Sequence, residues 1–176
     1  MYRGSVRGGL VAAIIAVSIQ SKSPARTTGQ LHAAEQVERL DVPQVLDRSM
    51  GDIHPGGNPH IHLDPHRMLE VAQLLAGRLV KIDAANANVY QRRLEDFQTR
   101  WQSAIERWQQ QALPLRGLSV VAHHKDWRYL LNWLGMEEVA TLEPKPGLPP
   151  NAAHLASLKK QMDEAHASMI LRAGYQ

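Results

Sequence analysis

The chain has 176 residues, 44% hydrophobic and 21% charged, which are values of one ordinary globular domain or parts of two and exclude a wholly disordered chain. Its net charge of +3 is due to basic residues near the start of the chain. Residues 1–34 hold four Lys or Arg and no acid, which leaves 16 basic against 17 acidic residues in the remainder. That remainder has no basic stripe with interleaved aromatic residues, and this argues against a nucleic-acid partner.

Residues 1–30 have the order of a secretory signal. A short basic opening, "MYRGSVR", precedes the apolar run "GGLVAAIIAVSI", which is too short to span a bilayer as a helix. The polar stretch that follows offers Ser23 and Ala25 as the small residues before a cleavage point. The alternative is a buried helix or strand. The sequence therefore predicts a periplasmic or otherwise exported protein with a signal-like or unmatched start.

Two helices are predicted next. Apolar residues recur at steps of three and four over residues 68–82, and again over 90–112. Asp83 is expected to cap the second helix, which would then be about 45 Å long and suited to bridging two bodies. The aromatic residues of its apolar stripe are expected to pack in the core, with Trp101 and Trp108 largely buried.

The remaining chain alternates strands and helices. Strands are predicted at 118–122, 137–142 and 168–171, with helices at 125–135 and 151–165. Such alternation predicts an α/β fold with right-handed crossovers and a parallel sheet. Ligands bind at the carboxyl ends of such strands, where His123, His124 and Glu143 stand.

The stretch "GNPHIHLDPH" concentrates three histidines in a chain without cysteine. His60, His62 and Asp64 match a metallo-hydrolase pattern of the His-x-His-x-Asp-His type, but Pro65 displaces His66 by one place. Asp followed by Pro is also a typical helix start, because Asp is a preferred N-cap and Pro suits the first helical position. We therefore expect Asp64 to be a cap and His66 to be exposed. In an extended segment His60 and His62 would point the same way.

Two longer stretches resemble one family. "SMGDIHPGGNPHIHLDPHRMLEVAQLLAGRL" resembles the Gly-Asn-Pro-His-x-x-Leu-Asp-Pro segment of zinc- and manganese-type solute-binding proteins of ABC importers. "VVAHHKDWRYLLNWLGMEEVATLEPKPGLPPNAAHLASLKKQM" resembles the same family's stretch in which a strand ends in a ligand His and a Glu-Pro-x-Pro-Gly loop follows. The resemblance runs from about residue 31 to about residue 172. It implies two α/β lobes joined by one long rigid helix.

On that template the domains follow in order. Residues 31–66 would be a remnant of the first lobe, 67–115 a helix pair that includes the linking helix, and 116–176 the first half of the second lobe. Complete members of the family are considerably longer, and the resemblance implies a further ligand His and a carboxylate that have no counterpart here. We therefore expect the middle of such a protein, truncated at both ends, with an incomplete site.

The resemblance also implies the metal ligands, which are His60 and His124. His62 and His123 stand where relatives commonly carry an aromatic residue, although either could lend a nitrogen. Two further residues are open to two interpretations. His54 either supports the site or is a solvated loop residue, and Glu143 either orients a ligand imidazole or simply ends a strand.

The expected function is binding of zinc, with manganese as the alternative metal, for delivery to the permease of an ABC transporter. Zinc is preferred because the identifiable ligands are imidazoles, whereas Mn²⁺ sites favour carboxylate oxygen. We expect a monomer without enzymatic activity that meets the membrane only through the transporter. The alternatives are a metal-dependent hydrolase built on His60, His62, Asp64 and His66, and an inert remnant.

Overall fold

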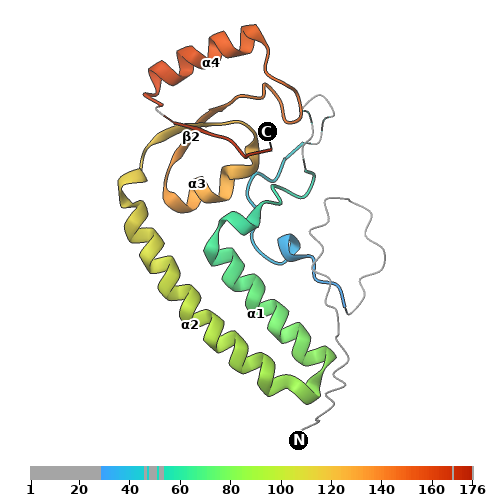
Figure 1. Ribbon diagram of the computed structural model, residues 1–176. Helices are drawn as coiled ribbons and strands as arrows, with labels where there is room; N and C mark the ends of the chain where they lie inside the picture. Colours follow the sequence, from blue (N-terminus) through green and yellow to red (C-terminus); the bar gives the residue numbers. More distant parts are fainter. Residues whose placement is uncertain (1–28, 46, 48–50, 52–53, 168, 176) are drawn as a thin grey trace, which may run out of the picture.

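The computed structural model describes residues 29–45, 47, 51, 54–167 and 169–175. The expected signal positions therefore lie outside the described residues, except for Gly29 and Gln30. Figure 1 shows two long helices, α1 (Pro65–Ile82) and α2 (Ala87–Ala112), lying side by side and extending from a smaller part that contains the strands. The segment that starts at Gly29 runs beside α1 (Figure 1).

The start of α1 agrees with its prediction, whereas the start of α2 does not. The Asp64 side chain caps α1 by accepting a hydrogen bond from the backbone N–H of His66. Asp83 ends α1 instead of capping α2, because a 3-10 turn, Ala84–Asn86, separates the two helices. The Asp83 carboxylate accepts hydrogen bonds from the side chains of Asn86 and Tyr90. With 26 residues, α2 is about 39 Å long.

The two helices pack through the aromatic stripe of α2. Trp101 stacks on Phe97 with ring centroids 5.2 Å apart, and it meets the edge of Trp108 at 5.4 Å. The Trp101 indole N–H also donates to the backbone oxygen of Pro65, 2.8 Å away, at the start of α1. Trp108 is 38% exposed, so the prediction that both tryptophans are largely buried is wrong for Trp108.

The three predicted strands form a parallel sheet. They are β1 (Ser119–Ala122), β2 (Glu137–Thr141) and β3 (Met169–Leu171), in the spatial order β2-β1-β3. The central strand is the most apolar, and Val120, Val121 and Ala122 are fully buried. In register, Val121 faces Ala140 on one side and Ile170 on the other. The predicted α/β class with a parallel sheet is therefore confirmed.

Two helices connect the strands. A 3-10 turn, Lys125–Trp127, leads into α3 (Arg128–Leu134), which ends at Gly135 in the left-handed conformation that glycine adopts easily. After β2, the Asn151 side chain caps α4 (Ala152–Glu164). The sheet lies between α3 and α4 (Figure 1), as expected for two right-handed crossovers that run in opposite directions along the sheet, from β1 to β2 and then from β2 to β3.

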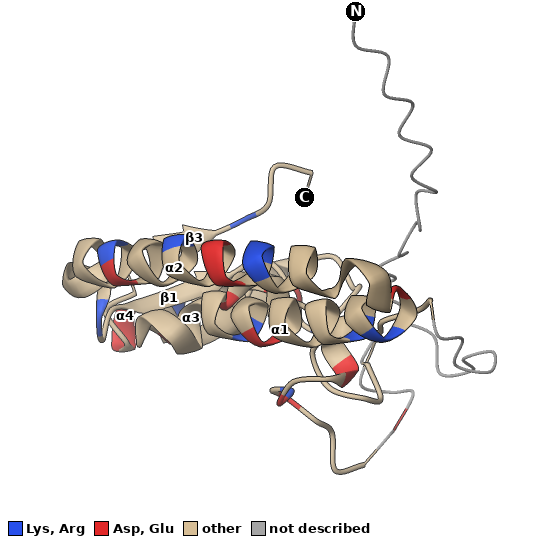
Figure 2. Ribbon diagram, turned by 90° about the horizontal axis from the view of Figure 1, so that it is seen from below, with Lys and Arg blue, Asp and Glu red and all other residues tan. Residues whose placement is uncertain are grey.

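The surface of the helix pair carries mixed charge. Residues of both charges are interspersed along α1 and α2 (Figure 2), and Arg100 pairs with Asp96 one turn away on α2. Such a surface has no single-sign field to follow a phosphate backbone. None of the helices in the described ranges combines the length and the apolar character needed to cross a bilayer.

One buried cluster joins the start of the described chain to the α/β part. Its members are apolar or aromatic and come from four elements and one irregular segment: Ala33, Val37, Ile61, Val71 and Tyr129. Tyr129 is fully buried on α3, and its hydroxyl accepts a hydrogen bond from the Leu40 N–H and donates one to the Asn58 carbonyl. The histidine-rich stretch is thereby held against α3.

Candidate metal centre

The Gly-Asn-Pro-His turn places His60 at the edge of the buried cluster. Gly57 has a φ of +91°, and a Cβ there would lie 2.9 Å from the Leu40 oxygen, so both conformation and space require glycine. Residues Ile61–Leu63 then form a 3-10 turn that starts directly after His60. The segment is therefore not extended. His60 and His62 are nevertheless neighbours, because their ring centroids are 6.1 Å apart.

The Asn58 side chain orients the His60 imidazole. Asn58 Oδ1 lies 3.0 Å from the backbone nitrogen of His60 and 2.9 Å from its ring Nδ1. Because an amide oxygen can only accept, the ring proton sits on Nδ1. A neutral His60 then has its free lone pair on Nε2, which is the form that binds a metal through that atom.

Glu143 orients His124 in the corresponding way. His124 follows β1 and Glu143 follows β2, so both stand at the carboxyl end of the sheet. His124 Nδ1 lies 2.6 Å from Glu143 Oε2, which also accepts from the Gly147 N–H at 2.9 Å. Burial acts to raise the pKa of Glu143, but these two hydrogen bonds and the electrostatic influence of the His124 and His123 imidazoles together outweigh it, and the pKa lies below its ordinary value. The ionised carboxylate keeps the proton of a neutral His124 ring on Nδ1 and leaves Nε2 for a metal.

The electrostatics of His60 show which groups surround it. Burial lowers the pKa of the His60 imidazole below its ordinary value, and the Asp126 carboxylate acts against that shift. The other imidazoles near it act in the same direction as burial, and they are His62, His54 and His124. His60 is therefore neutral near pH 7, which is the protonation state that a metal ligand needs.

The secondary site candidates take different positions. His54 and His62 flank His60, with ring centroids 6.3 and 6.1 Å from it, and His62 is exposed. His123 is half-buried at the end of β1, and its Nδ1 is buried without a hydrogen-bond partner. Within the part of the chain that the structure describes, no three His, Asp or Glu side chains form a group able to hold a metal ion.

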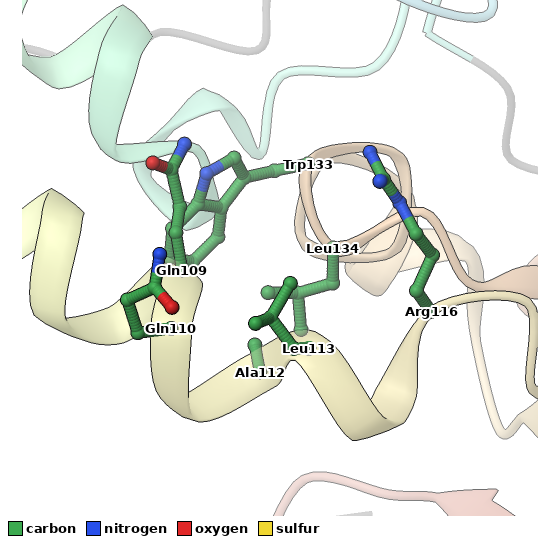
Figure 3. Close-up of a pocket in the computed structure, with 7 residues that line it drawn as sticks. All are labelled: Gln109, Gln110, Ala112, Leu113, Arg116, Trp133 and Leu134. Atoms are coloured by element: carbon green, nitrogen blue, oxygen red, sulfur yellow. The ribbon is translucent and has the colours of Figure 1, made fainter.

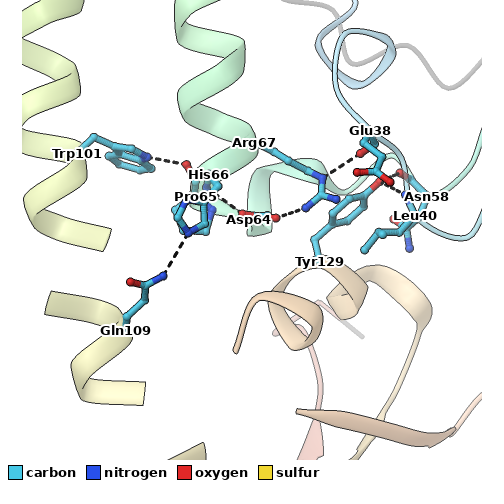
Figure 4. Close-up of polar contacts among 10 residues, drawn as sticks. All are labelled: Glu38, Leu40, Asn58, Asp64, Pro65, His66, Arg67, Trp101, Gln109 and Tyr129. Carbon is cyan, nitrogen blue, oxygen red and sulfur yellow. Dashed lines mark hydrogen bonds and ion pairs between the residues drawn. The ribbon is translucent and has the colours of Figure 1, made fainter. Parts of the chain in front are cut away.

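The hydrolase pattern does not assemble. Asp64 is buried, one of its oxygens accepts from the His66 N–H, and the other pairs with the Arg67 guanidinium (Figure 4). His66 is exposed and contacts Gln109 on α2 instead of the other histidines (Figure 4). With both carboxylate oxygens engaged, Asp64 serves as a helix cap and not as a metal ligand, as its place before Pro65 predicts.

Sequence reasoning missed the residues that connect the segment of His60 with the segment of His124. Asn58 Nδ2 donates to the Lys125 oxygen at 2.7 Å, directly after His124. Asp126, 6% exposed, lies close enough to His60 to influence its pKa. Asn58 was visible as part of the Gly-Asn-Pro-His motif, but nothing local in the sequence pairs it with residue 125.

A cavity of about 300 Å³ lies elsewhere, between the end of α2 and α3 (Figure 3). It is lined by Gln109, Gln110, Ala112, Leu113, Arg116, Trp133 and Leu134. Among its described lining residues Arg116 is the only ionisable one, and none is a histidine or a carboxylate of the kind that binds zinc. This cavity is therefore separate from the candidate metal centre.

Comparison with known proteins identifies the family. The model of the ZnuA family, described as zinc-uptake complex component A, periplasmic, matches residues 8–174. The chain therefore belongs to this family, whose members are transport binding proteins and not enzymes. A search of curated proteins gave no significant match.

Solved structures share the fold. Similar ones include the manganese complex of the solute-binding protein FpvC from Pseudomonas aeruginosa, at 23% identity and a TM-score of 0.63, covering 83% of this chain and 53% of that one. A zinc-bound variant of AdcAII from Streptococcus pneumoniae also has 23% identity and a TM-score of 0.63, with coverages of 80% and 52%. A zinc-bound deletion mutant of ZnuA has 20% identity and a TM-score of 0.62, with coverages of 80% and 50%. This chain thus spans about half the length of the solved structures it matches.

Proposed function

We propose that this chain is an extracytoplasmic binding protein that holds zinc through His60 and His124 for delivery to the permease of an ABC importer. The observation that carries the proposal is the matched orientation of the two imidazoles. Each ring has its Nδ1 tied to an oxygen acceptor, Asn58 for His60 and Glu143 for His124. A buried or solvated histidine with no ligand role does not require such an acceptor, whereas metal-binding histidines almost always have one.

Zinc is the proposed metal because both ligands are imidazoles. The solved relatives FpvC and AdcAII are described with manganese and nickel, and with zinc, respectively. Manganese favours carboxylate oxygen, and the carboxylate beside His124, that of Glu143, is engaged with His124 and Gly147. We therefore expect this chain to prefer zinc over manganese.

The proposed domain layout follows the family. Residues 31–66 would belong to the first lobe, 67–115 to the linking helix pair and 116–176 to the second lobe.

The expected affinity follows from the number of ligands. His60 and His124 are two ligands, which is one half of a four-coordinate zinc site. If a full structural site contributes about 10–16 kcal/mol, a proportional share is roughly 5–8 kcal/mol, which corresponds to a dissociation constant of about 1–200 µM.

The test is zinc competition with a chelating dye at pH 7.5 for the 176-residue chain and three variants. His60→Ala and His124→Ala should each abolish measurable binding, since either leaves one imidazole. His66→Ala is the matched control, because it removes an exposed imidazole at the start of α1. We expect it to bind zinc as the wild type does. Loss of binding in His66→Ala, with His124→Ala unaffected, would contradict the proposal and favour a hydrolase-type site.

A further inference from the structure

We propose that Asn58 is the positioning residue of this site, and that its side-chain amide sets both the tautomer of His60 and the distance between the two ligand-bearing segments. The inference rests on the proposed function for its effect on zinc. Its effect on the His60 ring does not need the metal. Asn58 itself ligates nothing.

The oxygen and the nitrogen of the Asn58 side-chain amide contact different segments of the chain. Its oxygen accepts two hydrogen bonds from His60, at 3.0 Å from the backbone nitrogen and 2.9 Å from ring Nδ1, which uses both lone pairs. Its nitrogen donates to the Lys125 carbonyl at 2.7 Å, one residue beyond His124. The amide carries an acceptor and a donor on one planar group and can therefore make both contacts. Asn58 therefore links the two histidine segments directly.

The backbone of Asn58 is held as firmly as its side chain. Its N–H donates to the Leu40 carbonyl at 2.8 Å, and its carbonyl accepts from the Tyr129 hydroxyl at 2.6 Å (Figure 4). Tyr129 is fully buried, and Arg67 lies over its ring at 4.9 Å from the centroid. Asn58 itself is 8% exposed. The amide is thus fixed before a metal arrives, so ordering it adds little cost on binding.

If Asn58 only stabilised the fold, its removal would have a different effect on His60. Removing it would lower the stability of the fold but leave the His60 proton where it is. A positioning asparagine moves that proton, because without an acceptor at Nδ1 the ring is free to place its proton on Nε2, where it blocks the metal. The tautomer therefore distinguishes the two roles.

The experiment records long-range proton–nitrogen NMR spectra of the metal-free 176-residue chain at pH 7.5, together with zinc affinity by dye competition. In the wild type we expect His60 as the Nδ1–H tautomer. In Asn58→Ala we expect a shift to the Nε2–H form and a loss of zinc affinity of about 10- to 100-fold, as for other partners of metal-binding histidines. An unchanged tautomer with wild-type affinity would overturn the proposal.

Asn58→Asp tests the acceptor and the donor of the amide separately, and it also serves if the alanine variant does not fold. The carboxylate still accepts from His60 Nδ1 but cannot donate to the Lys125 carbonyl. We expect the Nδ1–H tautomer to persist while zinc affinity falls between the wild type and Asn58→Ala. An Nε2–H tautomer in this variant would also overturn the proposal.

Asn151→Ala is the matched control. Asn151 also accepts from a backbone N–H, that of His154 at 2.9 Å, but at the exposed start of α4. We expect it to lower stability through loss of the helix cap and to change neither the His60 tautomer nor zinc affinity. If His60→Ala keeps wild-type zinc affinity, the proposed function fails, yet the tautomer in the metal-free protein still decides the role of Asn58.

Discussion

Trp101 offers the sharpest test of how the two long helices pack together. Replacing it by alanine removes an indole N–H bond to the Pro65 oxygen and two aromatic contacts, with Phe97 and Trp108. The hydrogen bond contributes about 1 kcal/mol net, and each aromatic pair about 0.5–1.5 kcal/mol. Fully buried Trp or Phe to Ala costs about 3–5 kcal/mol. Because Trp101 is only half-buried, we expect a loss of about 2–3 kcal/mol in unfolding free energy.

Trp101→Phe divides that loss into its parts. Phenylalanine keeps a ring against Phe97 and Trp108 but cannot donate to Pro65, so the expected loss is about 1 kcal/mol. Trp108→Phe is the control, because Trp108 is 38% exposed, and it should cost less than about 0.5 kcal/mol. Urea unfolding followed by far-ultraviolet circular dichroism measures all three without depending on tryptophan fluorescence. A loss below about 1 kcal/mol for Trp101→Ala, or equal losses for Ala and Phe, would refute this reasoning.

Three further predictions concern ionisable groups. Glu143→Gln should weaken zinc binding about tenfold in dye competition, because the neutral amide holds His124 Nδ1 less strongly than the carboxylate does; an unchanged affinity would show that Glu143 does not orient the ligand. Zinc affinity should fall as pH decreases below about 6.5, because protons compete with zinc for the imidazole nitrogens. Burial lowers the pKa of His60, so protonation of this ring should begin to weaken zinc binding only at a lower pH. Equal affinity at pH 7.5 and 4.5 would rule out imidazole ligands. Burial raises the pKa of Glu138, so its ionised carboxylate disfavours folding at pH values above that pKa. Glu138→Gln should therefore raise the urea midpoint of unfolding at pH 7, and the gain should disappear near pH 4. A lower midpoint for the variant at pH 7 would contradict this prediction.

Features that depend on short stretches of chain were predictable. The cap at Asp64 and the helix predicted at 151–165 were found because each depends only on neighbouring residues. The strands were found from β-branched runs between turn residues. Asp83 was misplaced because a local pattern cannot show whether a 3-10 turn intervenes before the next helix.

Features that depend on distant partners were not predictable. Asn58 meets Lys125 and Tyr129, which are 67 and 71 residues away, and no periodicity records such a pairing. The apolar stripe of α2 showed which face packs but not what covers its end, so the exposure of Trp108 was missed. For Glu143, two interpretations were open, and the contact with His124 favours the one in which it orients the imidazole.

The central claim is that one zinc ion is held by His60 and His124 together. The most direct measurement is a zinc titration of the nitrogen-labelled 176-residue chain, followed through the ring nitrogens of its histidines by long-range proton–nitrogen NMR. We predict that Nε2 of His60 and Nε2 of His124 shift together, reach saturation at one equivalent of zinc, and keep their protons on Nδ1, while the His62 ring does not take part. Separate saturation of the two rings, or a response confined to His54, His62 and His66, would contradict the claim.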